Sequence, residues 1–546
     1  MMKVEDAKVE AGPDIFSVED LRIEAQIGGR WAEIVKGISF QLKRGEVLGL
    51  VGESGAGKST IGLAALGNVK QGCRIAGGRV SFRGQDLFAS PENIRRKLRG
   101  TRIAYVAQSA AASFNPAKRL MDQVTEAAVK RGGQSKAEAK RNACRLFRAL
   151  QLPDPEIFGD RYPHQVSGGQ LQRAMAAMAL ICEPDLIVFD EPTTALDVTT
   201  QVEVLMAVRN AIETFGVAAI YITHDLAIVA QMADRIAVLR YGEIVEQGPT
   251  NQILENPRHS YTRSLWAVRE ILTEPSQKTR TLLRVDRVSA FYGLLQVLDD
   301  VSLEIGRAET VALVGESGSG KSTLGRLIAG LKEPESGSVT FDGVSCPPSV
   351  STRSKELLRR IQIIYQSADT ALNPRHTVRK IIGRPLSFYH GATGENREAR
   401  IGELLKLVEL DPAFADRLPG QLSGGQRQRV AIARALAANP ELIVCDEITS
   451  ALDQIVQADI LKMLVSLQEK LGISYLFITH DIATVKAIAN HVVVMHRGQI
   501  VEQGPKADVL SPPHPEYTQL LLSSVPEMTS GWLDKVISDR RKLAAA

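Results

Sequence analysis

The sequence has 546 residues, more than a single hydrophobic core usually supports, so we expect two domains of about 250 residues each. Its 66 basic and 62 acidic side chains give a net charge of +4, which gives no reason to expect a nucleic-acid partner. The five cysteines lie far apart without a CxxC pair, which favours a reducing compartment over a disulfide framework or a zinc site.

The N-terminal residues do not predict a secretory signal. The first residues, MMKVEDAKVEAGPD, lack the basic and apolar regions of a secretory signal. No apolar run approaches the ~20 residues needed to cross a bilayer. We therefore expect the chain to remain in the cytosol, where it could still sit on a membrane protein. The last residues, 542–546 (KLAAA), look like an expression-vector scar.

The first functional motif in chain order is a glycine-rich loop at 51–60, VGESGAGKST. An apolar strand-like run precedes it and an apolar helix-like run follows, which is the context that G-x-x-x-x-G-K-[ST] requires. In such a loop backbone N–H groups face the phosphates, the lysine reaches the outer phosphates, and the serine hydroxyl can bind Mg²⁺. The predicted phosphate-binding residues are Gly52, Ser54, Gly55, Gly57, Lys58, Ser59 and Thr60.

Four further motifs follow in the first half of the chain. Gln108 ends an apolar run, SGGQ occupies 167–170, LIVFDE ends at 191, and ITHD contains His224. Short β-rich runs alternate with helical stretches, which predicts a mostly parallel α/β sheet. The residues between Gln108 and SGGQ are rich in helix formers and predict a helical subdomain. A turn glycine between two apolar runs predicts a hairpin at 234–249.

The acidic pair that ends LIVFDE predicts a metal-binding and catalytic edge, because α/β proteins bind ligands at the carboxyl ends of their strands. Asp190 suits a Mg²⁺ ligand, and Glu191 is placed to orient or deprotonate the attacking water. Gln108 could complete the Mg²⁺ shell or sense the γ-phosphate, which His224 could also contact. Each residue alone would also suit an ordinary strand end, so these assignments rest on the repeat described next.

The same motifs recur in the second half, most of them about 256 residues later. This repetition argues against a mere glycine-rich turn in either half. A short polar linker, 273–281 (TEPSQKTRT), separates domains at 15–272 and 282–525, and a C-terminal tail occupies 526–546. The repeated residues are Gly315, Ser317, Gly318, Gly320, Lys321, Ser322, Thr323, Gln366, Asp446, Glu447 and His480.

Together these motifs resemble the nucleotide-binding domains of ATP-binding cassette (ABC) proteins over nearly the whole chain. SGGQ followed by a helix rich in Ala and Arg (QLQRAMAAMAL; QRQRVAIARAL) carries the resemblance, since P-loop kinases and GTPases lack it. The resemblance implies an α/β fold of two tandem P-loop NTPase domains. Each domain is expected to contain a mostly parallel sheet core, a helical subdomain and an antiparallel β element, and to hydrolyse ATP with Mg²⁺.

In this family two such domains face each other head to tail, and the signature of one closes over nucleotide held by the other. The resemblance therefore places the first ATP on Lys58 and Ser59 opposite the second signature, and the second on Lys321 and Ser322 opposite the first. The signature residues are Ser167, Gly168, Gly169 and Gln170 in the first half and Ser423, Gly424, Gly425 and Gln426 in the second. The implied metal ligands are Ser59, Gln108, Asp190, Ser322, Gln366 and Asp446.

Other positions match the family pattern or depart from it. Tyr292 matches the adenine-stacking aromatic residue, whereas Trp31 is only a candidate for that place in the first half. The departures are mild: Val166 replaces the usual Leu, and Ile448 the usual Pro. Because both halves keep Lys, Gln, Asp, Glu and His, we predict two hydrolysing sites. The family's dimer-contact aspartates are Asp197 and Asp453, and the expected catalytic residues are Glu191, His224, Glu447 and His480.

Three alternatives to a transporter fit part of the sequence. ABC-type translation factors also fuse two such domains, but they carry a long charged helical linker where this chain has a short one. Chromosome-maintenance ATPases split the domain with a long coiled coil, and the sequence shows no sustained heptad run. A cytosolic phosphotransferase would explain the glycine-rich loops but leave SGGQ unexplained.

Finer resemblance favours an importer of the dipeptide, oligopeptide and nickel subfamily. QSAAASFNP and QSADTALNP, after Gln108 and Gln366, look like that subfamily's Q-x-x-x-x-S/A-L-N-P loop. NPRHSYTRSL (256–265) and PPHPEYTQLL (512–521) look like its H-P-Y-T-x-x-L tail, although such tails can also be plain helix starts. Some relatives carry an iron-sulfur segment after this tail, and the scattered cysteines argue against one here.

The resemblance also implies partners. We expect two membrane-spanning permease subunits gripped near Gln108 and Gln366, nonidentical because the two loops that follow differ, and an extracytoplasmic solute-binding protein that acts indirectly. This places the chain on the cytoplasmic face of the bacterial inner membrane as a peripheral subunit. The sequence does not name the solute.

Overall fold

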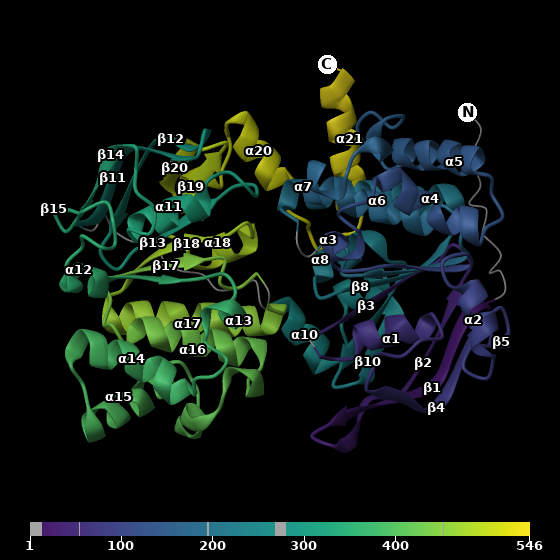
Figure 1. Cartoon of the computed structure of the whole chain (residues 1–546), viewed down its shortest axis with the longest axis horizontal. Coiled ribbons are helices and arrows are strands. Elements are labelled where there is room, and N and C mark those ends of the chain that lie inside the picture. Colours follow the sequence, from purple (N-terminus) through teal and green to yellow (C-terminus); the bar gives the residue numbers. More distant parts are fainter. Residues whose placement is uncertain (1–13, 54, 194–195, 268–279, 451, 546) are drawn as a thin grey trace. The chain divides into compact units, whose positions relative to one another are not determined.

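The computed structural model describes residues 14–53, 55–193, 196–267, 280–450 and 452–545. The chain divides into two compact units (Figure 1). The first comprises 1–196, 200–265 and 526–546, and the second comprises 197–199 and 266–525. Ser54 and most of the predicted linker lie outside the described residues.

A six-stranded sheet forms the core of the first unit. Its neighbouring strands β3, β6, β7, β8 and β9 pair in parallel, and β10 adds to β9 as an antiparallel edge that confirms the predicted hairpin. Every residue of β3, β7 and β8 is buried, as expected for parallel strands covered on both faces. The spatial order is β10 (Glu243–Pro249), β9 (Arg235–Arg240), β3 (Val47–Gly52), β8 (Ala218–Thr223), β7 (Leu186–Asp190) and β6 (Ile103–Val106).

An antiparallel sheet and a set of helices complete the first unit (Figure 1). The sheet order is β2 (Arg30–Lys43), β1 (Asp14–Ile27), β4 (Cys73–Phe82) and β5 (Gln85–Asp86). The helices are α1 (Lys58–Ala65), α2 (Glu92–Leu98), α3 (Ala110–Ser113), α4 (Leu120–Lys130), α5 (Lys136–Ala149), α6 (Gly168–Leu180), α7 (Val198–Phe215), α8 (Leu226–Met232), α9 (Thr250–Glu255), α10 (Ser260–Ala267) and α21 (Trp532–Ala545).

The helical subdomain forms because α4 and α5 each bury one apolar stripe. On α4, Leu120, Val124 and Ala128 are spaced four residues apart and are fully buried. On α5, Phe147 packs edge-on against Phe158, with ring centroids 5.2 Å apart. The predicted helical subdomain is therefore present between Gln108 and the first signature.

The second unit repeats this plan. Its six-stranded sheet has the order β16 (Ile361–Ile364), β17 (Leu442–Asp446), β18 (Ser474–Ile478), β13 (Thr310–Val314), β19 (His491–His496) and β20 (Gln499–Pro505). Its antiparallel sheet has the order β12 (Leu295–Gly306), β11 (Thr281–Tyr292), β14 (Ser336–Phe341) and β15 (Val344–Ser345). The helices are α11 (Lys321–Ile328), α12 (Lys355–Arg360), α13 (Ala368–Ala371), α14 (Val378–His390), α15 (Gly394–Leu407), α16 (Gly424–Leu436), α17 (Gln454–Leu471), α18 (Ile482–Ile488), α19 (Lys506–Val509) and α20 (Glu516–Ser523). The predicted tandem α/β fold is thus confirmed.

The C-terminal segment belongs to the first unit although it follows the second in the chain. Trp532 and Leu533 are buried in the first unit's hydrophobic core. The amide of Gln231 on α8 donates to the carbonyl oxygens of Glu527 and Thr529, at 2.8 and 2.9 Å, and accepts from the Leu533 N–H at 3.1 Å. These contacts make residues 526–533 a structural part of the first unit.

Across the described ranges, no helix combines the length and the apolar character that crossing a bilayer would require.

Replacing Trp532 by Ala should destabilise the first unit by about 3 kcal/mol, because a large side chain that is only 6% exposed leaves a cavity. Scanning calorimetry of the full chain should show a lower unfolding temperature for one transition. Ile157→Ala, in the same unit but 57% exposed, should change stability by no more than about 0.5 kcal/mol. Equal melting of the Trp532 variant and the wild type would show that the segment does not pack as described.

Candidate active site

The phosphate-binding loop of the first unit joins β3 to α1. β3 ends at Gly52, and α1 begins at Lys58 behind an N-terminal Gly57 with a left-handed φ of 96°. A Cβ atom at Gly52 would lie 2.1 Å from the carbonyl oxygen of Leu239, so only glycine permits this close approach. The loop thereby ends at a helix N-terminus, where unpaired backbone N–H groups bind anions.

The lysine side chain of each loop donates hydrogen bonds to backbone carbonyl oxygens of the same loop. Lys58 Nζ donates to the carbonyl oxygens of Gly52 and Glu53, at 2.6 and 2.9 Å. Its counterpart Lys321 donates to the equivalent carbonyls of the second unit at 2.9 and 2.7 Å. Burial lowers the pKa of the Lys321 ammonium. Both lysines are therefore held beside the place where the loop would bind phosphate.

The loop serine meets the predicted metal-binding aspartate in both units. Ser59 Oγ donates to Asp190 Oδ1 at 2.9 Å, and Ser322 Oγ donates to Asp446 Oδ1 at 2.7 Å. Burial raises the pKa of Asp446, although the hydrogen bond from Ser322 opposes the shift. A hydroxyl and a carboxylate at this separation are the oxygen ligands that Mg²⁺ prefers, so the residues present fit the ion.

One contact distinguishes the two aspartates. The Tyr105 hydroxyl, on β6, donates to Asp190 Oδ2. The matching residue of β16 is Ile363, which offers Asp446 no such bond. The sequence does not reveal this difference, because the bond joins residues that lie 85 positions apart in the chain.

The glutamates after these aspartates adopt an unusual backbone conformation. Glu191 and Glu447 both have a φ of 49°, in the left-handed region that residues other than glycine rarely occupy. Their carboxylates accept hydrogen bonds from Gln108 Nε2 at 3.0 Å and Gln366 Nε2 at 2.7 Å. A strained backbone that recurs in both units is typical of a functional site.

A histidine follows the next strand in each unit and lies beside the same glutamate. His224 Nδ1 is 3.4 Å from Glu191 Oε1, and His480 Nδ1 is 3.5 Å from Glu447 Oε1. Burial opposes protonation of these imidazoles, but the hydrogen bond and charge of the glutamate outweigh it and raise the pKa of both histidines. Burial likewise opposes ionisation of Glu447, but His480 and Lys321 outweigh it and lower its pKa.

The signature motifs begin helices. Ser167 Oγ accepts from the Gln170 N–H at 3.3 Å, and the Gln170 side chain accepts from the Ser167 N–H, so the two residues form a capping box that begins α6. Ser423 and Gln426 form the same box at α16. A Cβ at Gly169 would lie 2.1 Å from the Thr200 side chain, which explains a glycine there.

The predicted dimer-contact aspartates accept hydrogen bonds from residues close to them in the sequence. Asp453 caps α17 by accepting from the Val456 N–H at 3.0 Å, and Asp197 accepts from the Thr199 hydroxyl at 2.8 Å.

Two family models match this chain. The family model described as ABC transporter matches residues 35–194 and 298–450, and each match contains a phosphate-binding loop, a signature and an acidic pair. This chain belongs to the ABC transporter family. A second model, described as the C-terminal region of oligopeptide/dipeptide transporters, matches residues 245–286 and 501–545. Family membership makes the chain a nucleotide-binding ATPase with two tandem cassettes.

Relatives match the ABC chain over nearly its whole length. The glutathione import ATP-binding protein GsiA of Salmonella typhimurium is 37% identical, over 94% of this chain and 90% of the relative. The protein of the same name from Escherichia coli O6:H1 is 38% identical, over 95% of this chain and 90% of the relative. That of Pectobacterium atrosepticum is 37% identical, over 94% and 89%.

A tyrosine from each C-terminal region of this ABC chain contacts a phosphate-binding loop. The Tyr261 hydroxyl accepts from the Glu53 N–H at 3.2 Å, and the Tyr517 hydroxyl accepts from the Glu316 N–H at 2.9 Å. Burial raises the pKa of Tyr517 to about 12, so its hydroxyl stays protonated. The tail motifs, HSYT at 259–262 and HPEYT at 514–518, are visible in the sequence, but their contacts with the loops are not.

The adenine-stacking residues remain predictions. Tyr292 ends β11 with 47% of its surface exposed, and the Lys332 ammonium lies 5.0 Å from its ring centroid. Trp31 lies near the start of β2, is 42% exposed, and has the Arg74 guanidinium 4.2 Å from its ring centroid. The two aromatics therefore occupy different positions of the corresponding hairpins.

Replacing Glu447 by Gln should lower the pKa of His480, because the hydrogen bond and charge of the glutamate, which raise that pKa against the effect of burial, would be lost. In the wild type, the pair of protonated His480 and Glu447 stabilises the fold at low pH. This stabilisation is lost as the pH rises through the raised pKa of His480. Histidine NMR titration measures the shift. His224, whose partner Glu191 is unchanged, serves as the internal control; an unshifted His480 would refute the pairing.

Replacing Tyr517 by Phe should weaken ATP binding about fivefold at the second loop, since it removes one hydrogen bond of about 1 kcal/mol that holds the Glu316 N–H. Titration with a fluorescent ATP analogue measures the change. Tyr389→Phe, at a half-exposed tyrosine of α14, is the matched control. Identical affinities for all three proteins would mean that the tail does not support the loop.

Proposed function

We propose that this ABC ATPase powers the import of glutathione or related short peptides. Two complete sets of phosphate-handling side chains support this proposal, together with two matches to the C-terminal region of oligopeptide/dipeptide transporters. The similarity to glutathione import ATP-binding proteins points to the solute class.

In the proposed reaction, Glu191 and Glu447 accept a proton from the water that attacks the γ-phosphate. The lowered pKa of Glu447 keeps it ionised and able to accept that proton. Lys58 and Lys321 would balance charge on the outer phosphates, while His224 and His480 orient the glutamates they contact. Ser59 with Asp190, and Ser322 with Asp446, would hold Mg²⁺, with Gln108 and Gln366 completing its shell; the ion would neutralise phosphate charge.

Each ATP would lie between the loop of one half and the signature of the other. A capped helix N-terminus with two glycines at its start offers a second anion-binding cradle, which supports a role for Ser167 and Ser423 in covering the γ-phosphate. The assembled site would also include Gly168, Gly169 and Gln170 in one case and Gly424, Gly425 and Gln426 in the other. ATP binding would then close the two halves and hydrolysis would reopen them.

Import needs partners that this chain does not supply. We infer two permease subunits, nonidentical because the loops at 109–117 and 367–375 differ, and an extracytoplasmic binding protein that delivers the solute. The chain would act as a peripheral subunit on the cytoplasmic face of the inner membrane.

Glu191→Gln and Glu447→Gln should each reduce ATP hydrolysis, because losing a positioned base costs about 10²-fold or more at the affected site. The double variant should lose both hydrolysis and cellular uptake of labelled glutathione and short peptides. Lys43→Gln, a change at an exposed lysine on β2, is the control. Full activity of either single variant would show that its site contributes little, and unimpaired uptake by the double variant would refute the importer proposal.

A further inference from the structure

The two predicted metal-binding aspartates differ in how many protein groups hold them. Asp190 accepts a hydrogen bond at each carboxylate oxygen, from Ser59 Oγ at Oδ1, at 2.9 Å, and from the Tyr105 hydroxyl at Oδ2. Asp446 accepts from Ser322 Oγ at Oδ1, at 2.7 Å. Among the described residues, no group donates to Asp446 Oδ2. The first aspartate is therefore held at both oxygens and the second at one.

The difference comes from one position of the edge strand beside the acidic strand. Tyr105 lies opposite Val188 in the pairing of β6 with β7, and Ile363 lies opposite Val444 in the pairing of β16 with β17. Both side chains pack against the core cluster that includes the helix after the phosphate-binding loop, α1 in one unit and α11 in the other. The two positions are thus equivalent in register and in face, and only the tyrosine carries a hydroxyl that reaches the aspartate.

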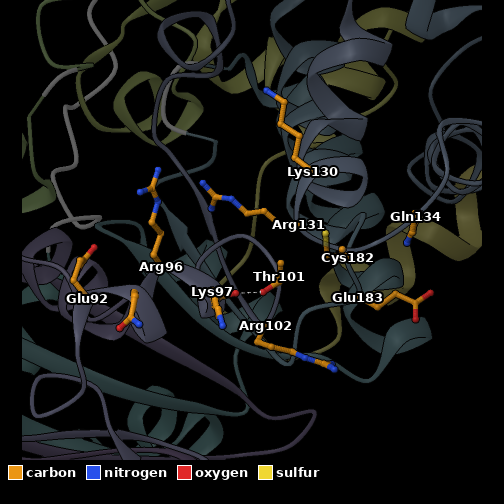
Figure 2. Close-up of a pocket in the computed structure, with 12 residues that line it drawn as sticks. Glu92, Arg96, Lys97, Thr101, Arg102, Lys130, Arg131, Gln134, Cys182 and Glu183 are labelled. Carbon is orange, nitrogen blue, oxygen red and sulfur yellow. Dashed lines mark hydrogen bonds between the residues drawn. The ribbon is translucent and has the colours of Figure 1, made fainter.

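The start of β6 is held by hydrogen bonds of its own. The carbonyl oxygen of Arg102, immediately before the strand, accepts from the Asp185 N–H at 2.9 Å. In the turn that precedes it, the Thr101 hydroxyl donates to the carbonyl oxygen of Lys97, the bond drawn as a dashed line in Figure 2. Tyr105 is therefore presented by a strand whose start is fixed, and not by a loop.

The directions of the hydrogen bonds in the first site suit an ion held by the serine. A hydroxyl has one proton and two lone pairs. Because the Ser59 proton goes to Asp190, the oxygen lone pairs remain available for Mg²⁺, and the orientation of the carboxylate decides where they point. Burial and the hydrogen bond to Asp190 raise the pKa of Tyr105, so the phenol stays protonated as a donor. A donor on the far oxygen limits rotation of the carboxylate and thereby fixes the serine hydroxyl.

We propose that Tyr105 is a positioning residue of the first ATP site, where it strengthens Mg²⁺ binding by holding Asp190, and that Ile363 leaves the second site with weaker binding of the ion. This inference rests on the Mg²⁺ role proposed above for the two aspartates, and it makes the two sites inequivalent. Loss of an outer hydrogen-bond partner of a metal ligand typically costs about 10- to 100-fold in affinity, which is large enough to measure. As Mg²⁺ becomes limiting, the second site would lose the ion first.

The test measures binding of Mn²⁺, which takes the same oxygen ligands as Mg²⁺ and is visible by electron paramagnetic resonance, to the full chain with a nonhydrolysable ATP analogue. In a Lys321→Ala background, which disables the second site, Tyr105→Phe should weaken Mn²⁺ binding about tenfold. The substitution keeps the ring in the core, so binding of the analogue without a divalent ion should stay unchanged. Tyr241→Phe, at a tyrosine that is 66% exposed, is the matched control.

Two results with Tyr105→Phe would overturn the proposal. Unchanged or tighter Mn²⁺ binding would show that the hydroxyl does not support the ion. Equal weakening of analogue binding with and without Mn²⁺ would show a general structural effect instead of a positioning role.

The converse substitution tests the second site. In a Lys58→Ala background, Ile363→Tyr should tighten Mn²⁺ binding, because it supplies the donor that Asp446 lacks. Ile363→Phe, which adds the ring without the hydroxyl, should not tighten it. Equal effects of the two substitutions would contradict the proposal.

Asp190→Asn separates this inference from the metal assignment on which it rests. If Asp190→Asn leaves Mn²⁺ affinity unchanged, the metal role of Asp190 and the role of Tyr105 both fail. If Asp190→Asn weakens Mn²⁺ binding but Tyr105→Phe does not, only the role of Tyr105 fails. None of these measurements depends on solute uptake, so the importer proposal is tested separately.

Discussion

The meeting of the phosphate-binding loop with two carboxylates at one sheet edge is the constraint on which each unit depends. β3 and β7 flank β8 in a parallel sheet, so the loop after β3 and the acids that end β7 emerge on the same side. The bond from Ser59 to Asp190 joins them directly. Glu191, in its left-handed conformation, then turns toward Gln108 and His224, which follow the strands on either side.

The C-terminal regions of the two halves contact the phosphate-binding loops at this edge. Tyr261 and Tyr517 each accept a hydrogen bond from the second residue of a phosphate-binding loop, so the segment that distinguishes peptide-type relatives also touches the catalytic loop. The final segment has another role, because Gln231 on α8, the helix that follows His224, binds its backbone. The chain end thus stabilises the element next to the first unit's histidine.

Much of this site could be predicted because its chemistry depends on local motifs. The loops, the acids after buried strands, and the repeated Gln and His are recognisable by residue type and spacing, and parallel strands bring them together. Contacts between distant segments could not be predicted. The bond of Tyr105 to Asp190, the tail tyrosines on the loops and the return of Trp532 to the first core depend on tertiary packing that no local pattern encodes. The tandem fold followed from the repeat, but the structural membership of 526–533 did not.

We propose that each phosphate-binding loop with its acids is completed only by the signature of the other half. ATP hydrolysis by the full chain in a Lys58→Ala background tests it most directly, because one site then remains. Adding Ser167→Arg should abolish the residual activity, whereas adding Ser423→Arg should leave it unchanged. The opposite pattern, with activity lost through Ser423 and retained without Ser167, would contradict the account.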